Sequence, residues 1–178
     1  MALSLPKLNF ADPDAQLDGA HKIVQEQTLC LPRQQVFAFF SDARNLEKLT
    51  PLWLNFKVVE IPDQLAAGSL IRYRLRLRGL PIHWTTRIEE WSPNQRFVDT
   101  QLAGPYALWH HTHEFENAPG GGTLIRDTVR YRVPLGKFGE PVRRLLVEPD
   151  TRKIFEYRRS AIERYLPGDT RPPSTPAS

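Results

Sequence analysis

Two adjacent segments alternate between apolar and polar residues with the two-residue period of a β-strand, and a glycine-rich stretch at 117–122 separates them. We expect an antiparallel hairpin in which one face of each strand points to the protein interior. These faces carry Trp109, His111, His113 and Phe115 on the segment 108–115, and Ile125, Asp127, Val129, Tyr131 and Val133 on the segment 124–133. Both faces are mainly apolar, yet together they contain two imidazoles, a carboxylate and a phenol. This composition is typical of a sheet face that lines a cavity.

Five other segments have the composition or the alternation of strands, at 21–31, 56–61, 70–78, 82–91 and 96–102. In the clearest of them the two faces separate completely, with Ile71, Tyr73, Leu75 and Leu77 on one and Arg72, Arg74, Arg76 and Arg78 on the other. We predict that the arginines lie on a solvated outer face, where their charges also discourage unwanted strand pairing. Contact with an anionic partner or a membrane surface is the alternative role for this row.

Helical spacing replaces the strand period in two places. After the first strand, Pro32 suits the first turn of a helix, and Asp42 can cap a second short helix from Ala43 to Leu49. Near the C-terminus an apolar stripe predicts a long helix from about residue 140 to residue 166, formed by Pro141, Leu145, Leu146, Ile154, Phe155, Arg158, Ala161, Ile162 and Tyr165. Pro149 should kink or split this helix, because proline lacks a backbone donor and clashes with the preceding turn.

The order of these elements predicts an α+β fold. Strands joined by short loops pair as antiparallel neighbours, and a sheet with one apolar face needs the long helix to cover it. We expect a helix-grip fold: a curved antiparallel sheet of about seven strands around the C-terminal helix, with two short helices after strand 1 and space between sheet and helix. Residues 21–167 form this ligand-binding domain, between an N-terminal arm at 1–20 and a tail at 168–178 whose composition predicts disorder.

Composition narrows the class of protein without identifying its ligand. Hydrophobic residues make up 40% of the 178-residue chain and charged residues 25%, as in soluble globular proteins. No apolar run reaches the ~18 residues of a membrane span, and the N-terminus has no continuous apolar region of a signal peptide. The single cysteine, Cys30, fits a reducing compartment, so we expect a cytoplasmic protein. The net charge of +4 is spread along the chain, which argues against a nucleic-acid partner.

Several local sequences carry a resemblance to a known superfamily. They are Pro32-Arg33-Gln34-Gln35-Val36-Phe37, the stretch from Gly104-Pro105-Tyr106 to His113-Glu114-Phe115, the stretch from Gly121-Gly122-Thr123 to Tyr131-Arg132-Val133-Pro134, and Ile154-Phe155-Glu156-Tyr157-Arg158. With the order of elements, they make the chain resemble the START-like, Bet v 1-like (SRPBCC) superfamily, and within it the bacterial polyketide cyclase/dehydrase-like group. The resemblance runs from about residue 21 to residue 166. It implies the fold, but that superfamily contains cyclases, lipid and quinone carriers and receptors, with no universal catalytic motif.

The parity of the strands predicts which residues of the pocket meet. If Phe115 lies opposite Ile125, then His113 lies opposite Asp127 and Trp109 opposite Tyr131; a shift of two residues brings His111 to Asp127 instead. A four-residue turn at 92–95 points Phe97, Asp99 and Gln101 inward and brings Asp99 to His111, whereas a slip of one residue reverses this facing. Tyr73, Trp84, Trp109, Phe115 and Phe155 are the expected apolar contacts of a ligand, although aromatic residues at such positions more often fill a core.

Three interpretations of the His–Asp pair remain open at this point. A structural pair is expected because a buried carboxylate needs a donor. An acid–base site would use His111 or His113 with Asp127 and Tyr131, because a carboxylate holds an imidazole in one tautomer and makes it a better base. A metal site would use His111, His113 and Asp127 as ligands, but it is the weakest interpretation because no cysteine cluster or further inward histidine accompanies them.

The sequence therefore predicts a protein that binds a hydrophobic small molecule, such as a polyketide, isoprenoid, quinone or lipid-like compound, in an internal cavity. The alternative is a polyketide cyclase or dehydratase that uses acid–base residues in the same cavity. We predict no cofactor, no bound metal and no transmembrane segment, and peripheral membrane contact stays open through the arginine row.

Overall fold

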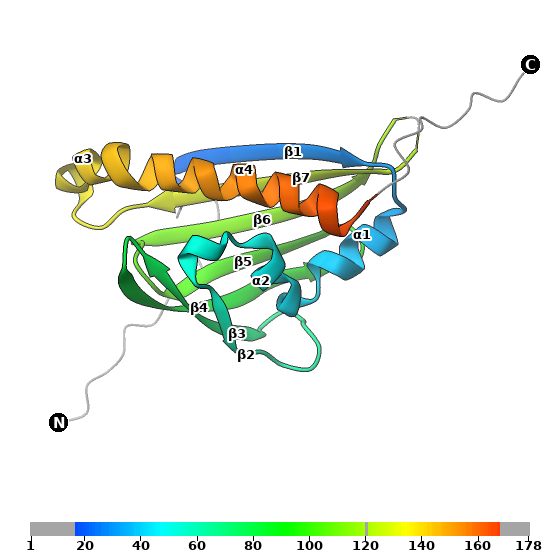
Figure 1. The fold of residues 1–178 in the computed structure, drawn as a ribbon, viewed down its shortest axis with the longest axis horizontal. Coiled ribbons are helices and arrows are strands. Elements are labelled where there is room, and N and C mark those ends of the chain that lie inside the picture. The colour runs from blue at the N-terminus through cyan, green and yellow to red at the C-terminus, as the bar shows by residue number, and fades with distance from the viewer. Residues whose placement is uncertain (1–16, 120, 168–178) are drawn as a thin grey trace, which may run out of the picture.

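The computed structural model describes residues 17–119 and 121–167, and it contains one seven-stranded antiparallel sheet (Figure 1). The strands follow the order β1-β7-β6-β5-β4-β3-β2, so the first strand returns to pair with the last. Their bounds are β1 His21–Leu29, β2 Lys57–Glu60, β3 Leu70–Leu77, β4 Leu80–Ser92, β5 Arg96–Ala103, β6 Leu108–Asn117 and β7 Thr123–Arg132. The predicted arm and tail fall largely on residues 1–16 and 168–178, which lie outside the described residues.

The register of the central hairpin is the one that parity predicts. On β6 and β7, Phe115 pairs with Ile125, and His113 pairs with Asp127. On the other side of β6, Asp99 of β5 pairs with His111, which confirms the inward facing expected for the strand at 96–102. The register between β4 and β5 shifts twice, and such irregularities bend a sheet and increase its twist. The sheet is accordingly curved, and its histidine-bearing strand lies near the middle.

The helices lie on one side of this sheet (Figure 1). After β1 come the helix α1, Arg33–Phe40, a 3-10 turn at Ala43–Asn45 and the short helix α2, Leu46–Leu49. Asp42 caps the turn as predicted, because its carboxylate accepts a hydrogen bond of 3.0 Å from the backbone N–H of Arg44. A further 3-10 turn, Leu52–Leu54, follows before β2.

The C-terminal helical segment contains an irregular turn where proline was expected to disturb it. A 3-10 turn at Gly136–Gly139 and α3, Glu140–Val142, are followed by a π-helical turn, Arg143–Val147, and then by α4, Glu148–Tyr165. Pro149 is the second residue of α4, and it follows the π turn after Glu148. Helical geometry therefore continues through Pro149, and the disturbance takes the form of a wider turn ahead of it.

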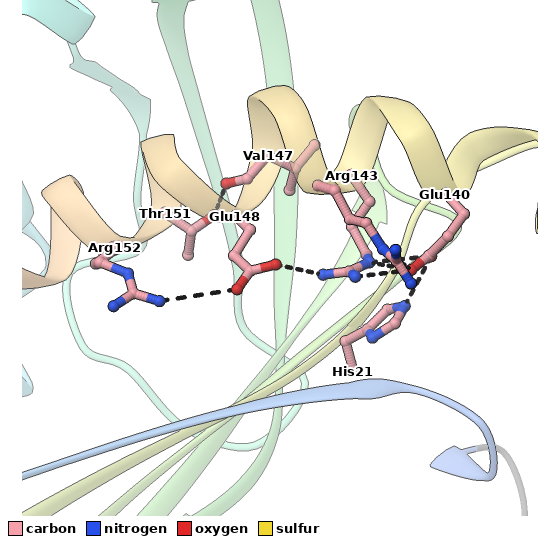
Figure 2. A network of polar contacts seen from close by, with 8 residues as sticks. His21, Glu140, Arg143, Val147, Glu148, Thr151 and Arg152 are labelled. Atoms are coloured by element: carbon pink, nitrogen blue, oxygen red, sulfur yellow. Dashed lines mark hydrogen bonds and ion pairs between the residues drawn. The ribbon is translucent and has the colours of Figure 1, made fainter.

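A network of charged side chains fixes the start of this segment to the sheet edge (Figure 2). Glu140 accepts hydrogen bonds from Arg143, the shortest of 2.7 Å, and lies 3.4 Å from Nε2 of His21 on β1. Arg143 also donates to Glu148 at 2.7 Å, and Arg152 of the next turn lies 3.7 Å from the same carboxylate. The network joins β1, the π turn and α4 across the point where the helix is irregular.

Apolar packing closes one end of the space between sheet and helix. The largest cluster joins α1 and the last turns of α4 to the middle of the sheet, through Val36, Phe37, Phe40, Phe97, Phe115, Ile125, Ala161 and Ile162. A second cluster under the first turns of α4 contains Val129, Tyr131, Val133 and Phe155. The structure leaves a gap in the packing near β3, β4 and β5, and this gap becomes the site described below.

The arginine row on β3 is confirmed for three of its four members. Arg72, Arg74 and Arg76 are exposed on the outer face, while Ile71 of the opposite face is buried. Arg78 departs from the row because β3 ends at Leu77 and Arg78 adopts a left-handed backbone with φ of 50°. Its guanidinium instead reaches Asp150 of α4, with hydrogen bonds of 2.9 and 3.1 Å. The β3–β4 turn is thereby tied to the helix that covers the sheet.

None of the helices in the described part of the chain has the length and apolar composition needed to cross a bilayer.

Candidate ligand-binding cavity

A cavity of about 180 Å³ lies between the sheet, α2 and α4. Five of the seven residues predicted to contact a ligand line it: Tyr73, Trp84, Asp99, Trp109 and Phe155. Most of its other walls are aliphatic or aromatic, from Phe40 and Leu46 at one end to Leu77 and Tyr106 at the other. Because an apolar protein cavity of ~150 Å³ can hold a benzene molecule, this space is sufficient for a compact ring compound.

The polar atoms of two aromatic side chains that line the cavity, Tyr73 and Trp84, are hydrogen-bonded to a neighbouring group. The Trp84 indole N–H donates to the Thr86 hydroxyl at 3.1 Å, and the Tyr73 hydroxyl lies 3.1 Å from the same oxygen. The rings of Tyr73 and Trp84 stack with centroids 5.8 Å apart, and Trp109 meets Trp84 edge to face. Burial raises the pKa of Tyr73, so this phenol stays neutral. These side chains present apolar ring surface to an occupant.

Polar side chains line one part of the cavity: Asp99, His111 and His113 come from the sheet, and Arg158 comes from α4. Nε2 of His113 donates a hydrogen bond of 2.9 Å to Oδ2 of Asp99. Nδ1 of His111 lies 3.8 Å from the same carboxylate oxygen, and the two imidazole rings are 3.8 Å apart at their centroids. The pairs expected from parity therefore meet in three dimensions, and they face the space that the apolar residues enclose.

A second carboxylate, Asp127, lies behind the two histidines. Its Oδ1 is 2.6 Å from Nδ1 of His113 and 3.4 Å from Nε2 of His111, so each imidazole lies between two carboxylates. Oδ2 of Asp127 is 3.4 Å from Nε of Arg158, which α4 places over the sheet. The side chain of Asp127 is 4% exposed, and it does not line the cavity. Asp127 thus positions the histidines and does not itself meet an occupant.

The pKa values of the two histidines are shifted in opposite directions. Burial lowers the pKa of His111, and the neighbouring His113 lowers it further, against the pull of Asp127 and Asp99. Burial acts on His113 in the same sense, but Asp127 and Asp99 outweigh it and raise the pKa of His113. The arrangement therefore favours the neutral imidazole at His111 more than at His113.

Both carboxylates stay ionised in spite of their burial. Burial alone would raise the pKa of Asp127, but Arg158 and the two histidines hold it well below its usual range. For Asp99 the same opposing effect of burial is outweighed chiefly by the hydrogen bond from His113, so its pKa is lowered. An ionised carboxylate on each side of His113 is consistent with the direction of the histidine's own shift.

Three predicted site residues lie elsewhere. Phe115 is packed in the apolar cluster with Phe37 and Phe40, and it does not line the cavity. Tyr131 is 2% exposed, packs against His21 and Trp109, and contributes with Glu140 to raising the pKa of Arg143, so its hydroxyl serves the helix anchor. Gln101 uses its amide on the backbone of Tyr106, donating at 2.7 Å to the carbonyl. All three face inward as predicted, but the space beside them is filled.

Arg158 is the main residue that sequence reasoning placed without assigning it a role. It lies three residues after Phe155 and three before Ala161, on the stripe that packs against the sheet. A cation on a buried stripe signals a buried anion nearby, because an unpaired buried charge is costly. Thr86 and Tyr106 also belong to the cavity. For these two residues, the sequence indicated only a position on a strand or in a loop and no role in a site.

The fold is that of a helix-grip protein, with an internal cavity between the sheet and the helices. The sequence profile of the polyketide cyclase/dehydrase and lipid transport family matches residues 29–156. The chain belongs to this family, and with it to the START-like, Bet v 1-like superfamily. The match covers the strands from β2 to β7, both short helices and the first turns of α4.

Solved structures agree with this assignment at the level of the fold. TTHA0849 from Thermus thermophilus superposes with a TM-score of 0.64 at 21% identity, over 82% of this chain and 97% of that one. CV1439 from Chromobacterium violaceum gives 0.64 at 16% identity, over 83% and 99% of the chains. Ara h 8.0201 gives 0.58 at 18% identity, over 83% and 98%. No curated protein sequence matches the chain significantly.

Proposed function

We propose that this protein binds a compact hydrophobic molecule with at least one polar oxygen, in the cavity between the sheet and α4. The supporting observation is the arrangement of the walls: aromatic and aliphatic on most sides, with Asp99, His111 and His113 on one. Apolar pockets with a few converging polar groups are the usual form of small-molecule sites. Polyketides, isoprenoids, quinones and lipid-like compounds share this chemistry, and the volume favours a single ring or a short chain.

The exposed thiol of Cys30 supports the expectation of a reducing compartment, and we place the protein in the cytoplasm. The bound molecule would then be a metabolite of that compartment.

Filling the cavity tests the binding function. Ile71 lines the cavity and is 4% exposed, so Ile71→Trp should occupy the space and weaken binding of a single-ring probe, acetophenone, at least tenfold in a calorimetric titration. Val59→Trp adds the same ring at a site 62% exposed on β2 and should leave binding unchanged. Thermal melting shows that both variants are folded. Equal probe affinity in the parent and Ile71→Trp would contradict the proposal, and native mass spectrometry of protein from its own host identifies what co-purifies.

A second function, acid–base catalysis of a dehydrating cyclisation, is favoured by the opposite pKa directions of His111 and His113. Sites that pair an acid with a base separate the pKa values of two neighbouring groups in this way. His111 would remove a proton beside a carbonyl, and His113 would donate a proton to the departing hydroxyl, which leaves as water. Tyr131, predicted as a partner in this chemistry, is not part of the proposed reaction because it lies outside the cavity.

Proton removal can be tested without knowing the natural substrate. Acetophenone is a single-ring ketone, and deuterium incorporation at its methyl group in D₂O reports proton abstraction beside the carbonyl. We expect chelator-treated parent protein to accelerate this exchange and His111→Gln to reduce it to the buffer rate, while affinity for the ketone changes less than threefold. His110→Asn, on the opposite face of the same strand, is the control and should exchange like the parent. Exchange at the buffer rate in the parent would favour binding alone.

A further inference from the structure

We propose that Asp99, His111 and His113 form a site for one divalent transition-metal ion on the polar wall of the cavity, with Asp127 and Arg158 holding the two histidines in position. The proposal goes beyond ligand binding, since an apolar molecule can occupy the cavity without an ion. It also changes the ligand set expected from the sequence, which grouped Asp127 with the two histidines.

The spacing of the donor atoms suits a metal ion. One ligand atom from each of Asp99, His111 and His113 lies within 4.8 Å of the other two. Oδ2 of Asp99 is 2.9 Å from Nε2 of His113 and 3.8 Å from Nδ1 of His111. Ligands bound at ~2.0–2.1 Å to a tetrahedral ion lie roughly 3.3 Å apart, between these two distances. Small rotations of the side chains would therefore complete the set.

The opposite nitrogen of each imidazole lies close to a carboxylate, at ion-pair distance. Nδ1 of His113 and Nε2 of His111 both face Oδ1 of Asp127, at 2.6 and 3.4 Å. A histidine that binds a metal through one nitrogen usually donates its other N–H to a carboxylate or carbonyl, which fixes the tautomer. Here a single carboxylate serves both rings, and Arg158 balances its charge from α4. The nitrogens on the other side of the rings, Nε2 of His113 and Nδ1 of His111, lie on the side of Asp99, and an ion would replace the proton that His113 shares with that carboxylate.

The position of the site gives the ion a free coordination position. Asp99, His111 and His113 line the cavity, whereas Asp127 lies behind them. Three protein ligands with an open position are typical of sites that bind or activate another molecule, while structural sites are closed by four. An enolate, phenolate, carboxylate or carbonyl oxygen of the cavity's occupant would complete the coordination. Imidazole with one carboxylate favours zinc, cobalt, iron, nickel or copper over magnesium and calcium.

Titration with Co²⁺ and Zn²⁺ tests the site in the full chain after treatment with a chelator. We expect one equivalent of Co²⁺ to bind and to produce the visible absorption of a four- or five-coordinate ion, and one equivalent of Zn²⁺ to displace it. Asp99→Asn and His111→Ala should weaken binding at least 100-fold. Asp127→Asn should weaken it about 10–100-fold, as loss of a carboxylate behind a metal-binding histidine does.

The control is His110→Asn, which removes the neighbouring imidazole from the other face of β6 and should bind like the parent. Thermal melting of the ion-free proteins shows which variants are folded. Should His111→Ala fail to fold, Asp99→Asn still decides, because its side chain is 16% exposed and the replacement is nearly isosteric. The proposal is overturned if the parent shows no saturable one-to-one binding of Co²⁺. It is also overturned if His110→Asn loses Co²⁺ binding while Asp99→Asn keeps it. Binding of acetophenone, followed in parallel by calorimetry, separates failure of the metal site from failure of the cavity.

Discussion

Nε of Arg158 on α4 lies 3.4 Å from Oδ2 of Asp127 on β7, and both side chains are largely withdrawn from solvent, at 12% and 4% exposure. The guanidinium also lies over the Phe40 ring, 5.5 Å from its centroid. Through this pair the helix that covers the sheet contacts the carboxylate that holds both histidines. Packing of the helix and orientation of the imidazoles are therefore coupled.

Replacing Arg158 should show this coupling as a loss of stability. Arg158→Met keeps the length of the side chain but leaves Asp127 buried without its cation, and breaking a buried ion pair in this way typically costs about 3–5 kcal/mol. We expect chemical denaturation to give a free energy of unfolding lowered by roughly that amount, at the lower end because the guanidinium is partly exposed.

Arg159→Met is the matched control for this experiment. Arg159 is the next residue of α4, and its side chain is exposed, so the same replacement should change the free energy of unfolding by about 0.5 kcal/mol or less. If both variants unfold like the parent, Arg158 does not stabilise the buried carboxylate.

The outer face of β3 should tolerate loss of its charges. Arg74 and Arg76 are exposed, and exposed charges contribute little to stability. The double variant Arg74→Gln, Arg76→Gln is expected to unfold within about 1 kcal/mol of the parent in a urea titration. A loss above ~2 kcal/mol would mean that these side chains are packed rather than solvated.

Tyr131 should matter for stability and not for the cavity. Its ring is buried under α4, and its hydroxyl serves Arg143 rather than the space beside His111. Tyr131→Phe should cost about 1 kcal/mol, the usual net value of one hydrogen bond, and leave the affinity for acetophenone unchanged. Weakened probe binding in a fully folded Tyr131→Phe protein would instead place the phenol in the site.

The helix anchor should make stability depend on acidic pH. The Arg143 guanidinium, with smaller help from Arg144 and His21, lowers the pKa of Glu140 from 4.5 to about 2 (Figure 2). A carboxyl group with a lowered folded-state pKa contributes stability above its unfolded pKa and loses it as the pH falls through the folded value. The contribution of Glu140 is therefore complete above about pH 4.5 and disappears toward pH 2.

Glu140→Gln should remove this part of the pH dependence. Melting temperatures measured between pH 2 and pH 6 should fall less steeply with acid in Glu140→Gln than in the parent, and the difference should shrink at high salt because the group is exposed. Glu156→Gln removes an exposed carboxylate from the same helix and should keep the parent's profile. Parallel profiles for the parent and Glu140→Gln would contradict the assignment.

The sheet was predictable because a strand has a strict two-residue period. The same period predicted two pairs of the polar cluster, His113 with Asp127 and Asp99 with His111. Once Phe115 and Ile125 were taken as inward neighbours, His113 had to lie opposite Asp127, and the structure confirms that pairing. The inward position of Asp99 followed from the length of the turn before β5, and its pairing with His111 is confirmed as well. The long helix was equally evident from its apolar stripe.

Parity could not distinguish a cavity from a core. Phe115, Tyr131 and His113 share a face, but only His113 faces open space, because α1 fills the volume beside Phe115 and the start of α4 covers Tyr131. The rotation of α4 about its own axis was also beyond the sequence. Without knowledge of this rotation, the partner of Arg158 on the apolar stripe could not be predicted.

The π-helical turn at Arg143–Val147 sets that rotation. A π turn holds one residue more than the α-helical turn it replaces, and each residue turns an α-helix by about 100°. Deleting one residue from this turn would restore a regular helix and swing one side of it around its axis. Either Arg158 would leave Asp127, or Glu140 would leave His21 on the edge strand. The extra residue thus sets the rotation of α4 relative to the start of the segment, so that one helical segment contacts the sheet at two points. Relatives that lack this residue in an alignment should have lost one of the two contacts.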